Sequence, residues 1–190
     1  MRIIAGEFRS RTLEAPAGLA TRPTSDRLRE TLFNILAPRI EGAAFLDLYA
    51  GSGAVGIEAI SRGAASVVFV ERAEAALKVL RKNLEKLGVN AGFKIQTGSA
   101  GACLRRLVLS PGASFDLVFL DPPYDLAGEY ASTLGLLGGS EGLLASGALV
   151  IAEHRRKGKL EDQYGALDRT RLLEQGDAAL SFYAVGQPPA

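Results

Sequence analysis

The stretch Phe-Leu-Asp-Leu-Tyr-Ala-Gly-Ser-Gly-Ala-Val-Gly, residues 45–56, decides the fold of this 190-residue chain. An apolar, strand-like segment runs into the pattern Gly51-x-Gly53-x-x-Gly56, and a helix-like segment, 55–62, follows it. A glycine-rich turn between a strand and a helix brings the backbone close to a ligand, and the helix N-terminus favours negative charge. The pattern alone fits a dinucleotide site, an S-adenosylmethionine site or a tight connection that binds nothing.

Two acidic residues narrow these alternatives. Asp47 lies four residues before the first glycine, where its carboxylate can receive the ammonium group of S-adenosylmethionine, and the turn holds no basic residue to partner a pyrophosphate. The second strand, 66–70, ends in Glu71, the position at which an acid accepts hydrogen bonds from ribose hydroxyls. A nicotinamide dinucleotide and S-adenosylmethionine both carry such a ribose, so Glu71 favours a nucleoside ligand without distinguishing between them. The alternative for Glu71 is a surface carboxylate that caps the next helix.

A second motif, Asp121-Pro122-Pro123-Tyr124, directly follows the apolar run 115–120. Two prolines cannot continue a ladder of backbone hydrogen bonds, so the strand ends in a rigid corner. The corner combines a carboxylate and backbone carbonyls, which accept hydrogen bonds, with a flat aromatic ring. These groups suit an exocyclic amino group on a ring that stacks. The alternative is a tight turn after a core strand.

Composition limits the classes of protein that the chain can represent. It is 47% hydrophobic, and no apolar run approaches the roughly 20 residues needed to cross a membrane. The N-terminus lacks the apolar core of a signal peptide, and a single cysteine, Cys103, suits a reducing cytoplasm. One cysteine and one histidine, His154, do not make a zinc site of the usual kind. We therefore expect a cytoplasmic protein with no metal.

Charge is unevenly distributed, although the net charge is only +1. Residues 1–40 hold seven arginines against four acids, a local net charge of +3. Arginine without lysine suits phosphate groups and stacking on bases, so this region predicts nucleic-acid contact. A second basic run, 154–159, follows a predicted strand end. For both runs the alternative is an ordinary solvated face.

The remaining pattern alternates strands and helices, which predicts an α/β fold with a mostly parallel sheet covered on both faces. A basic hairpin extension, 1–23, precedes a single domain, 24–186. The first helix is capped around 24–26 and ends near Pro38. The predicted strands are 44–49, 66–71, 93–97, 115–121, 147–153, 167–175 and 178–185; the predicted helices are 55–62, 73–87, 99–108, 127–137 and a short one near 141–145. The last two strands form a hairpin that inserts one antiparallel strand into the seven-stranded sheet.

In an open parallel sheet, ligands bind beyond the C-terminal ends of the strands. The first and fourth strands are neighbours where the strand order reverses, so the glycine turn and the Pro-Pro corner share one crevice. A methyl donor at the turn then faces an amine at the corner. Asp121 and the Pro122 carbonyl accept the N–H groups of the amine, and Tyr124 stacks on the base.

These motifs resemble the RsmD family of bacterial methyltransferases, which methylate the exocyclic N2 of one guanine in 16S rRNA of the small ribosomal subunit. The resemblance rests on 2–6, 22–34, 47–59 and 121–124, and it covers nearly the full chain. It implies the class I methyltransferase fold (Rossmann-like), S-adenosylmethionine as donor and a small subunit, assembled or assembling, as preferred substrate. It also implies that Thr24 and Asp26 help to hold the methionine end of the donor.

Three sets of site residues follow. The catalytic set is Asp121, Pro122, Pro123 and Tyr124. The cofactor-binding set is Thr24, Asp26, Asp47, Gly51, Ser52, Gly53, Glu71, Arg72, Ser99 and Ala100. The RNA-binding set is Arg2, Arg9, Arg11, Arg22 and Arg27. Relatives often carry Asp or Asn after the third strand to bind adenine, whereas this chain offers Ser99 and the backbone N–H of Ala100.

Other functions fit parts of the pattern. DNA and protein amide methyltransferases share the Pro-Pro corner but usually carry Asn in place of Asp121. A non-catalytic RNA-binding factor in ribosome assembly and a nicotinamide oxidoreductase are the further alternatives. We expect a monomer that uses no membrane and no metal.

Overall fold

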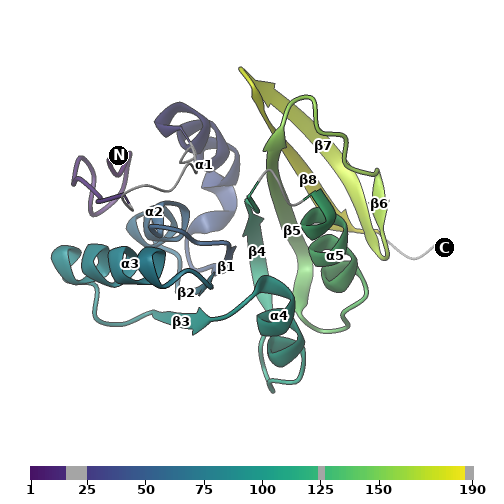
Figure 1. Cartoon of the computed structure of the whole chain (residues 1–190), viewed down its shortest axis with the longest axis horizontal. Helices are drawn as coiled ribbons and strands as arrows, with labels where there is room; N and C mark the ends of the chain where they lie inside the picture. Colours follow the sequence, from purple (N-terminus) through teal and green to yellow (C-terminus); the bar gives the residue numbers. More distant parts are fainter. Residues whose placement is uncertain (16–24, 124–126, 187–190) are drawn as a thin grey trace.

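The computed structural model describes residues 1–15, 25–123 and 127–186, and these residues form one α/β unit around a single sheet (Figure 1). In chain order the elements are α1 (Asp26–Ile40), β1 (Ala44–Leu48), α2 (Ala54–Ser61), β2 (Ser66–Glu71), α3 (Glu74–Leu87), β3 (Phe93–Thr97), α4 (Ala100–Val108), β4 (Phe115–Leu120), α5 (Ala127–Gly138), β5 (Leu144–Arg155), β6 (Gln163–Tyr164), β7 (Leu167–Gln175) and β8 (Ala178–Val185).

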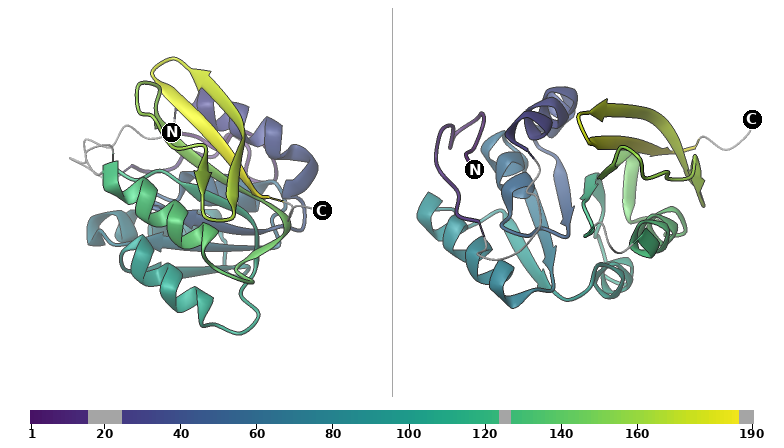
Figure 2. Two further views of the ribbon diagram at one scale, coloured as in Figure 1. Left: turned by 90° about the vertical axis from the view of Figure 1, so that its right-hand side faces the viewer. Right: turned by 45° about the horizontal axis from the view of Figure 1, so that its top comes forward.

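The order of the strands confirms the predicted class of fold. The eight strands of the described chain lie in the order β3-β2-β1-β4-β5-β8-β7-β6. The pairs from β3 to β5 are parallel, and β8 inserts antiparallel between β5 and β7. The two views of Figure 2 show the β7–β8 hairpin as an extension at the end of the sheet away from α3. The strand order reverses between β1 and β4, as the two motifs require.

Buried side chains of the strands alternate between two apolar layers. Phe45 of β1 and Phe119 of β4 lie in the layer covered by α1, α2 and α3, whereas Leu46 and Val118 lie in the layer covered by α4 and α5. Successive residues of a strand point to opposite faces, so both faces need an apolar side chain at almost every position. This requirement explains why the parallel strands read as nearly continuous apolar runs.

One helix end, one helix and one strand differ from the prediction. Helix α1 continues past Pro38 to Ile40; Pro38 lacks the N–H that would bond the carbonyl of Asn34, and both residues lie on the exposed side of the helix. The predicted short helix near 141–145 is absent, because Leu144 instead pairs with Phe115 and begins β5. The two-residue strand β6 was not predicted, since so short a pairing leaves no pattern in the sequence.

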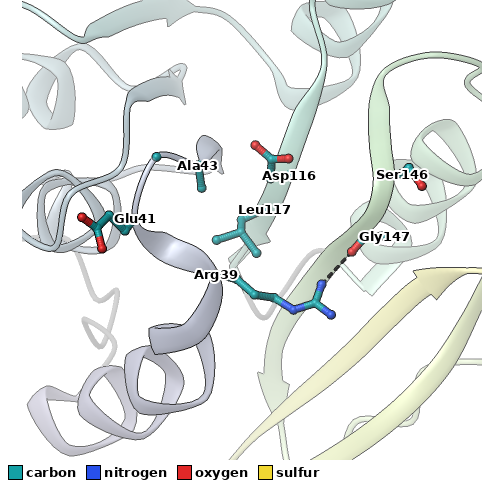
Figure 3. A pocket seen from close by; sticks show the side chains of 8 residues that line it. Arg39, Glu41, Ala43, Asp116, Leu117, Ser146 and Gly147 are labelled. Atoms are coloured by element: carbon teal, nitrogen blue, oxygen red, sulfur yellow. Dashed lines mark hydrogen bonds between the residues drawn. The ribbon is translucent and has the colours of Figure 1, made fainter.

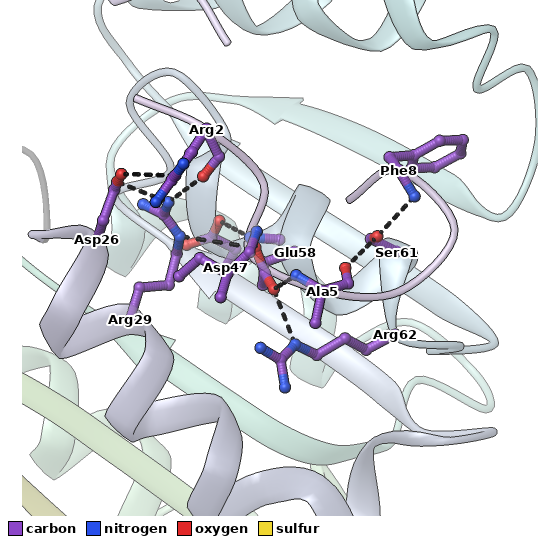
Figure 4. A network of polar contacts seen from close by, with 11 residues as sticks. Arg2, Ala5, Phe8, Asp26, Arg29, Asp47, Glu58, Ser61 and Arg62 are labelled. Carbon is purple, nitrogen blue, oxygen red and sulfur yellow. Dashed lines mark hydrogen bonds and ion pairs between the residues drawn. The ribbon is translucent and has the colours of Figure 1, made fainter. Parts of the chain in front are cut away.

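The N-terminal segment reverses direction, but it is not the regular hairpin that the sequence predicts. Its two arms pair only over residues 1–3 and 10–13, where Arg2 lies opposite Thr12 and the N–H groups of Ile3 and Leu13 donate to the carbonyls of Arg11 and Met1 at 2.9 and 3.0 Å. The N–H groups of Ile4 and Ala5 instead donate to the carboxylate of Glu58 on α2, at 2.8 and 3.0 Å (Figure 4). These two N–H groups therefore do not pair with the second arm of the segment. The predicted boundary between extension and domain, 23/24, lies outside the described residues.

A buried ionic network holds this segment against the domain. Arg29 and Glu58 are both fully buried, with 3.8 Å between Arg29 Nε and Glu58 Oε2. Glu58 also accepts from Nε of Arg62 at 2.8 Å, and Arg29 donates to Asp26 and to the carbonyl of Arg2 (Figure 4). Buried charges of this kind are tolerated only when paired and hydrogen-bonded. The network therefore fixes the position of the N-terminal segment relative to α1 and α2.

Candidate active site

The predicted motifs meet at one edge of the sheet, where the parallel strands end. The glycine turn follows β1, Glu71 ends β2, Ser99 precedes α4 and Asp121 follows β4. Residues Asp47 and Leu48 of β1 pair with Phe119 and Leu120 of β4. The glycine turn and the Pro-Pro corner therefore start from neighbouring strands at the same level. Thr24, Tyr124 and Arg22 lie outside the described residues.

Close packing accounts for two of the three glycines in the turn. Gly53 has a φ of +81°, and a Cβ there would lie 2.3 Å from Cδ1 of Leu80. A Cβ at Gly56 would lie 2.2 Å from Cε1 of Phe69 and 3.0 Å from a carboxylate oxygen of Asp47. Only glycine permits this contact of the turn and α2 with the sheet. The glycines thus set the fold of the turn directly, whatever ligand it holds.

Asp47 is buried beside the turn and binds it. Its Oδ2 accepts from the backbone N–H of Gly56 at 2.9 Å, and its side chain is almost completely buried. Burial raises the pKa of Asp47 to about 7; the Gly56 N–H opposes that rise, and the nearby charge of Glu71 adds to it. A buried carboxylate with a raised pKa is stabilised by any cation placed next to it.

Glu71 closes the turn from the end of β2. Its Oε2 accepts from the N–H of Gly51 at 2.8 Å, and its Oε1 accepts from Arg72 and Ala73 at 2.8 and 2.7 Å. A carboxylate has about four acceptor positions, so these three bonds fix its orientation and leave further capacity for a hydroxyl. The side chain of Arg72 is exposed at this edge.

Ser99 is the N-cap of α4, with its hydroxyl 3.4 Å from the N–H of Ala102. Its hydroxyl therefore already accepts a hydrogen bond from the first turn of the helix. Ala100 is the first residue of α4, where backbone N–H groups have no partner inside the helix. The geometry therefore favours the backbone of Ala100 over the side chain of Ser99 as a ligand contact.

Asp121 lies next to two other carboxylates. One residue beyond the pair Leu120–Ala152, Asp121 comes beside Glu153 of β5. Asp47, Asp121 and Glu153 continue the alternation of Phe45, Phe119 and Ile151, so all three point to the face covered by α1 to α3. Burial is the main cause that raises the pKa of Asp121 well above its usual value, and the charges of Glu153 and Asp47 add to this rise. Pro122 is buried and Pro123 exposed.

Glu153 was not among the predicted residues. It lies inside a long apolar strand and is almost fully buried. The sequence signal for Glu153 is an acidic residue inside an apolar strand, at the position that lies beside Asp121 in the sheet.

Tyr49, between Asp47 and the glycine turn, binds α5 through its side chain. Its φ is +64°, which turns the side chain away from the face of Asp47 and toward α5. The hydroxyl lies 2.6 Å from Oε2 of Glu129 and 2.7 Å from Oγ1 of Thr133, both on α5. Burial and Glu129 raise the pKa of Tyr49, which keeps the hydroxyl protonated as a donor.

Asn83 is a second residue that sequence reasoning missed. It is fully buried on α3, and its amide donates to the carbonyl of Ser52 at 3.0 Å and to that of Glu14 at 3.1 Å. Its Oδ1 accepts from the N–H of Glu14 at 2.9 Å. Asn83 therefore connects the glycine turn to the N-terminal segment. An asparagine three residues after Leu80, in the buried stripe of α3, is the available signal.

Asp26 stands at the start of α1, where it is held by arginines. Nη2 of Arg29 donates to it at 2.9 Å, and Nε of Arg2 lies at 4.0 Å. Its side chain remains 46% exposed, so it is accessible as well as oriented.

The predicted RNA-binding arginines separate into two places. Arg2 and Arg27 are exposed at the start of α1. Arg9 is exposed in the turn after Phe8, which is bound to Ser61 at the far end of α2, whereas the exposed Arg11 lies beside Arg2, since its carbonyl accepts from the N–H of Ile3 at 2.9 Å. Helix α2 runs away from the site edge, so Arg9, next to its far end, lies away from that edge.

Two further arginines of residues 1–40 serve the fold. Arg29 is fully buried, and Nη1 of Arg39 donates to the carbonyl of Gly147 at 2.7 Å. The basic surface is therefore smaller than the arginine count of the sequence indicates.

A shallow pocket of about 240 Å³ lies at the opposite edge of the sheet (Figure 3). It is lined by Arg39, Glu41 and Asp116, among others. Oδ2 of Asp116 accepts from the N–H of Ala44 at 2.8 Å, and Arg39 is bound to Gly147. None of the residues predicted for the site lines it.

Within residues 1–15, 25–123 and 127–186, no set of three His, Cys, Asp or Glu side chains is arranged to hold a metal ion. Over the same residues, no helix has the length and hydropathy of a membrane span.

The sheet order, the glycine turn and the acidic corner together define a class I methyltransferase fold, the Rossmann-like fold of S-adenosylmethionine-dependent methyltransferases. The family described as "Conserved hypothetical protein 95" matches residues 1–184. The chain therefore belongs to this family, the RsmD family.

Known proteins agree with this assignment. The chain is 40% identical over 153 residues to "Ribosomal RNA small subunit methyltransferase D" of Escherichia coli K12, which covers 80% of this chain and 74% of the relative. It is 34% identical over 183 residues to YlbH of Bacillus subtilis, covering 96% and 98%. The solved structure of yhhF from Escherichia coli has a TM-score of 0.81 at 35% identity and covers 96% of both chains.

Proposed function

We propose that this protein transfers a methyl group from S-adenosylmethionine to the exocyclic N2 of a guanine in 16S rRNA of the small ribosomal subunit. The observation that carries the proposal is the position of Asp121 beside the donor-type glycine turn on neighbouring strands. The relative from Escherichia coli, named for methylation of small-subunit rRNA, supports the substrate class.

The residues at the edge fit the donor. Asp47 and Glu71 supply negative charge near the glycine turn, for an ammonium group and for ribose hydroxyls. Stretch 47–56 holds no basic residue, so it does not suit a pyrophosphate. The donor supplies an activated methyl group when it is bound. The residues of the chain have to place the amine in line with that group.

The Pro-Pro corner contributes to methyl transfer by positioning the amine and by supplying negative charge. Guanine N2 is a weak nucleophile because its lone pair is delocalised into the ring. The Asp121 carboxylate and the Pro122 carbonyl accept its two N–H groups and hold the nitrogen at near-attack distance, and alignment of this kind contributes several kcal/mol. Positive charge develops on the nitrogen as its bond to the methyl carbon forms and the sulfur–carbon bond of the donor breaks, so both acceptors bind the transition state more strongly than the substrate. The proton that the nitrogen then loses passes to the Asp121 carboxylate or to water. Pro123 keeps the corner rigid, and Tyr124 stacks on the base.

The experiment is transfer of a labelled methyl group to small subunits isolated from a strain that lacks this enzyme. Naked rRNA, DNA and bulk protein serve as parallel substrates, and the modified base is mapped. We expect one N2-methylguanine in 16S rRNA of the subunits. Label in DNA or in protein, or on another atom of rRNA, would contradict the proposal.

A further inference from the structure

The turn after β5 carries an exposed basic cluster that the proposed site does not use. We call residues 155–159 the β5 turn; they read Arg-Arg-Lys-Gly-Lys and contain no acid. All five residues are exposed. The preceding His154 is buried, and burial lowers its pKa, so its ring adds no charge near neutral pH. The positive charge of this region therefore resides in the turn itself.

The register of the sheet places this turn beyond the corner. Strand β4 ends at Leu120, opposite Ala152, whereas β5 continues for three further residues to Arg155. At about 3.3 Å per residue, the β5 turn begins roughly 10 Å past the level of Leu120. In Figure 1 both this turn and the start of α1 lie beyond the end of β4, on opposite sides of it. The Asp121 corner thus lies between two basic surfaces.

Hydrogen bonds hold the β5 turn in place. The N–H of Arg156 donates to the carbonyl of Asp177 in the β7–β8 hairpin at 2.8 Å, and its Nε lies 2.9 Å from a Glu174 carboxylate oxygen. Within the turn, Gly158 N–H donates to the Arg155 carbonyl at 2.8 Å. A turn fixed in this way loses little conformational entropy when its side chains bind a ligand.

Two lysines of the β5 turn do not contribute to the fold through ion pairs. Across the part of the chain that the structure describes, the side chains of Lys157 and Lys159 form no ion pair or hydrogen bond. By contrast, Nζ of Lys82 lies 2.9 Å from a Glu14 carboxylate oxygen. Ammonium groups held at a site edge without a protein partner suit phosphate oxygens.

On the basis of the proposed function, we propose that Lys157 and Lys159 form a second RNA-binding surface. They bind phosphates on one side of the target guanine, while Arg2 and Arg27 bind phosphates on the other side. An enzyme that acts on an unstacked base has to hold the strand on both sides of it. A base held at Asp121, between the two surfaces, meets this requirement.

The test compares two variants with equal loss of charge. Lys157→Gln/Lys159→Gln removes the lysines of the turn, and Lys94→Gln/Arg105→Gln removes two exposed cations elsewhere, on β3 and α4. RNA affinity is measured from 50 to 300 mM salt, together with donor affinity and the thermal midpoint. All four side chains are exposed, so we expect both variants to fold as the wild type does.

We expect the turn variant to bind RNA on the order of 3- to 10-fold more weakly, with a salt slope smaller by about 1.4 to 1.8, and the control to match the wild type. Donor affinity stays unchanged in both. A wild-type slope in the turn variant, or an equal loss in the control, would overturn the inference. Absence of methyl transfer by the wild type would contradict only the proposed function, because the binding slopes are read without turnover.

Discussion

The hydroxyl of Tyr49 lies 2.6 Å from Oε2 of Glu129, so the first residue after β1 is bonded to the helix that follows the Pro-Pro corner. Tyr49 reaches α5 because its backbone adopts a positive φ at the point where the strand ends. The glycine turn is therefore connected through this side chain to α5, 80 residues away in sequence. We expect the position of the Pro-Pro corner relative to the turn to depend on this bond.

Tyr49→Phe removes the hydroxyl and keeps the ring. We expect the free energy of unfolding, measured in urea, to fall by about 1–2 kcal/mol, because Glu129 and Thr133 lose a half-buried partner. The rate constant kcat falls by more than donor affinity does, since alignment of the corner is disturbed. Thr133→Val is the matched control, because it keeps the Glu129 contact. Wild-type stability together with wild-type kcat in Tyr49→Phe would contradict this role.

Glu153→Gln tests the influence of the buried carboxylate on its neighbour. The charge of Glu153 contributes to the raised pKa of Asp121, and the acceptor role needs the Asp121 carboxylate ionised. Activity is therefore lost as pH falls through that raised pKa. Removing the charge lowers the pKa of Asp121, so the acid limb of the kcat/KM profile moves to lower pH. Glu141→Gln, exposed and at a distance, leaves the profile unchanged; an unmoved limb in Glu153→Gln contradicts the assignment.

Asp47→Asn separates stability from ligand binding. The pKa of Asp47 is about 7 in the folded chain, against 3.8 for an unperturbed aspartate, so the folded state binds more protons between these values. Its contribution to stability is full below pH 3.8 and is lost as pH rises through 7. At pH 8 without ligand, we expect Asp47→Asn to raise the free energy of unfolding by roughly 2–4 kcal/mol.

The same substitution weakens donor binding, because the ammonium group loses its carboxylate. Chemical unfolding at pH 5 and pH 8, with donor titration at pH 8, measures both effects. A variant that is less stable than the wild type at pH 8 would show that the buried charge is not costly to the fold.

Glu58→Gln breaks the network under the N-terminal segment. It removes the negative charge that pairs with Arg62 and with the buried Arg29, whose remaining carboxylate partner is the half-exposed Asp26, and we expect this to cost about 3 kcal/mol of unfolding free energy. Gln keeps one side-chain oxygen, so one of the N–H groups of Ile4 and Ala5 loses its acceptor, and limited proteolysis within residues 2–10 becomes faster. Glu30→Gln, exposed on α1, is the control. Unchanged stability and proteolysis in Glu58→Gln would show that the segment is held by other contacts.

The sequence predicted the sheet, most helices and the edge at which the motifs meet, because these depend on local periodicity and on the rule for parallel sheets. Residues Glu58, Asn83 and Glu153 escaped prediction for a different reason. Their roles depend on partners from distant segments, such as Ile4 for Glu58 and Glu14 for Asn83. A polar residue in a buried stripe signals that a partner exists, but it does not identify the partner.

Periodicity also failed where tertiary pairing decided the outcome. The stretch 141–145 reads as a short helix, yet Leu144 pairs with Phe115 of the sheet. The predicted N-terminal hairpin is shorter than expected, because a buried carboxylate accepts from the N–H groups of Ile4 and Ala5.

The most direct measurement concerns Asp121. Asp121→Ala and Asp121→Asn are compared with the wild type for donor affinity by calorimetry and for single-turnover methyl transfer to small subunits. We expect a donor Kd within a few-fold of the wild type and transfer that is abolished in Asp121→Ala and strongly reduced in Asp121→Asn, whose amide keeps one acceptor without the charge. Near-native single-turnover transfer by Asp121→Ala would contradict the proposed role of Asp121 in catalysis.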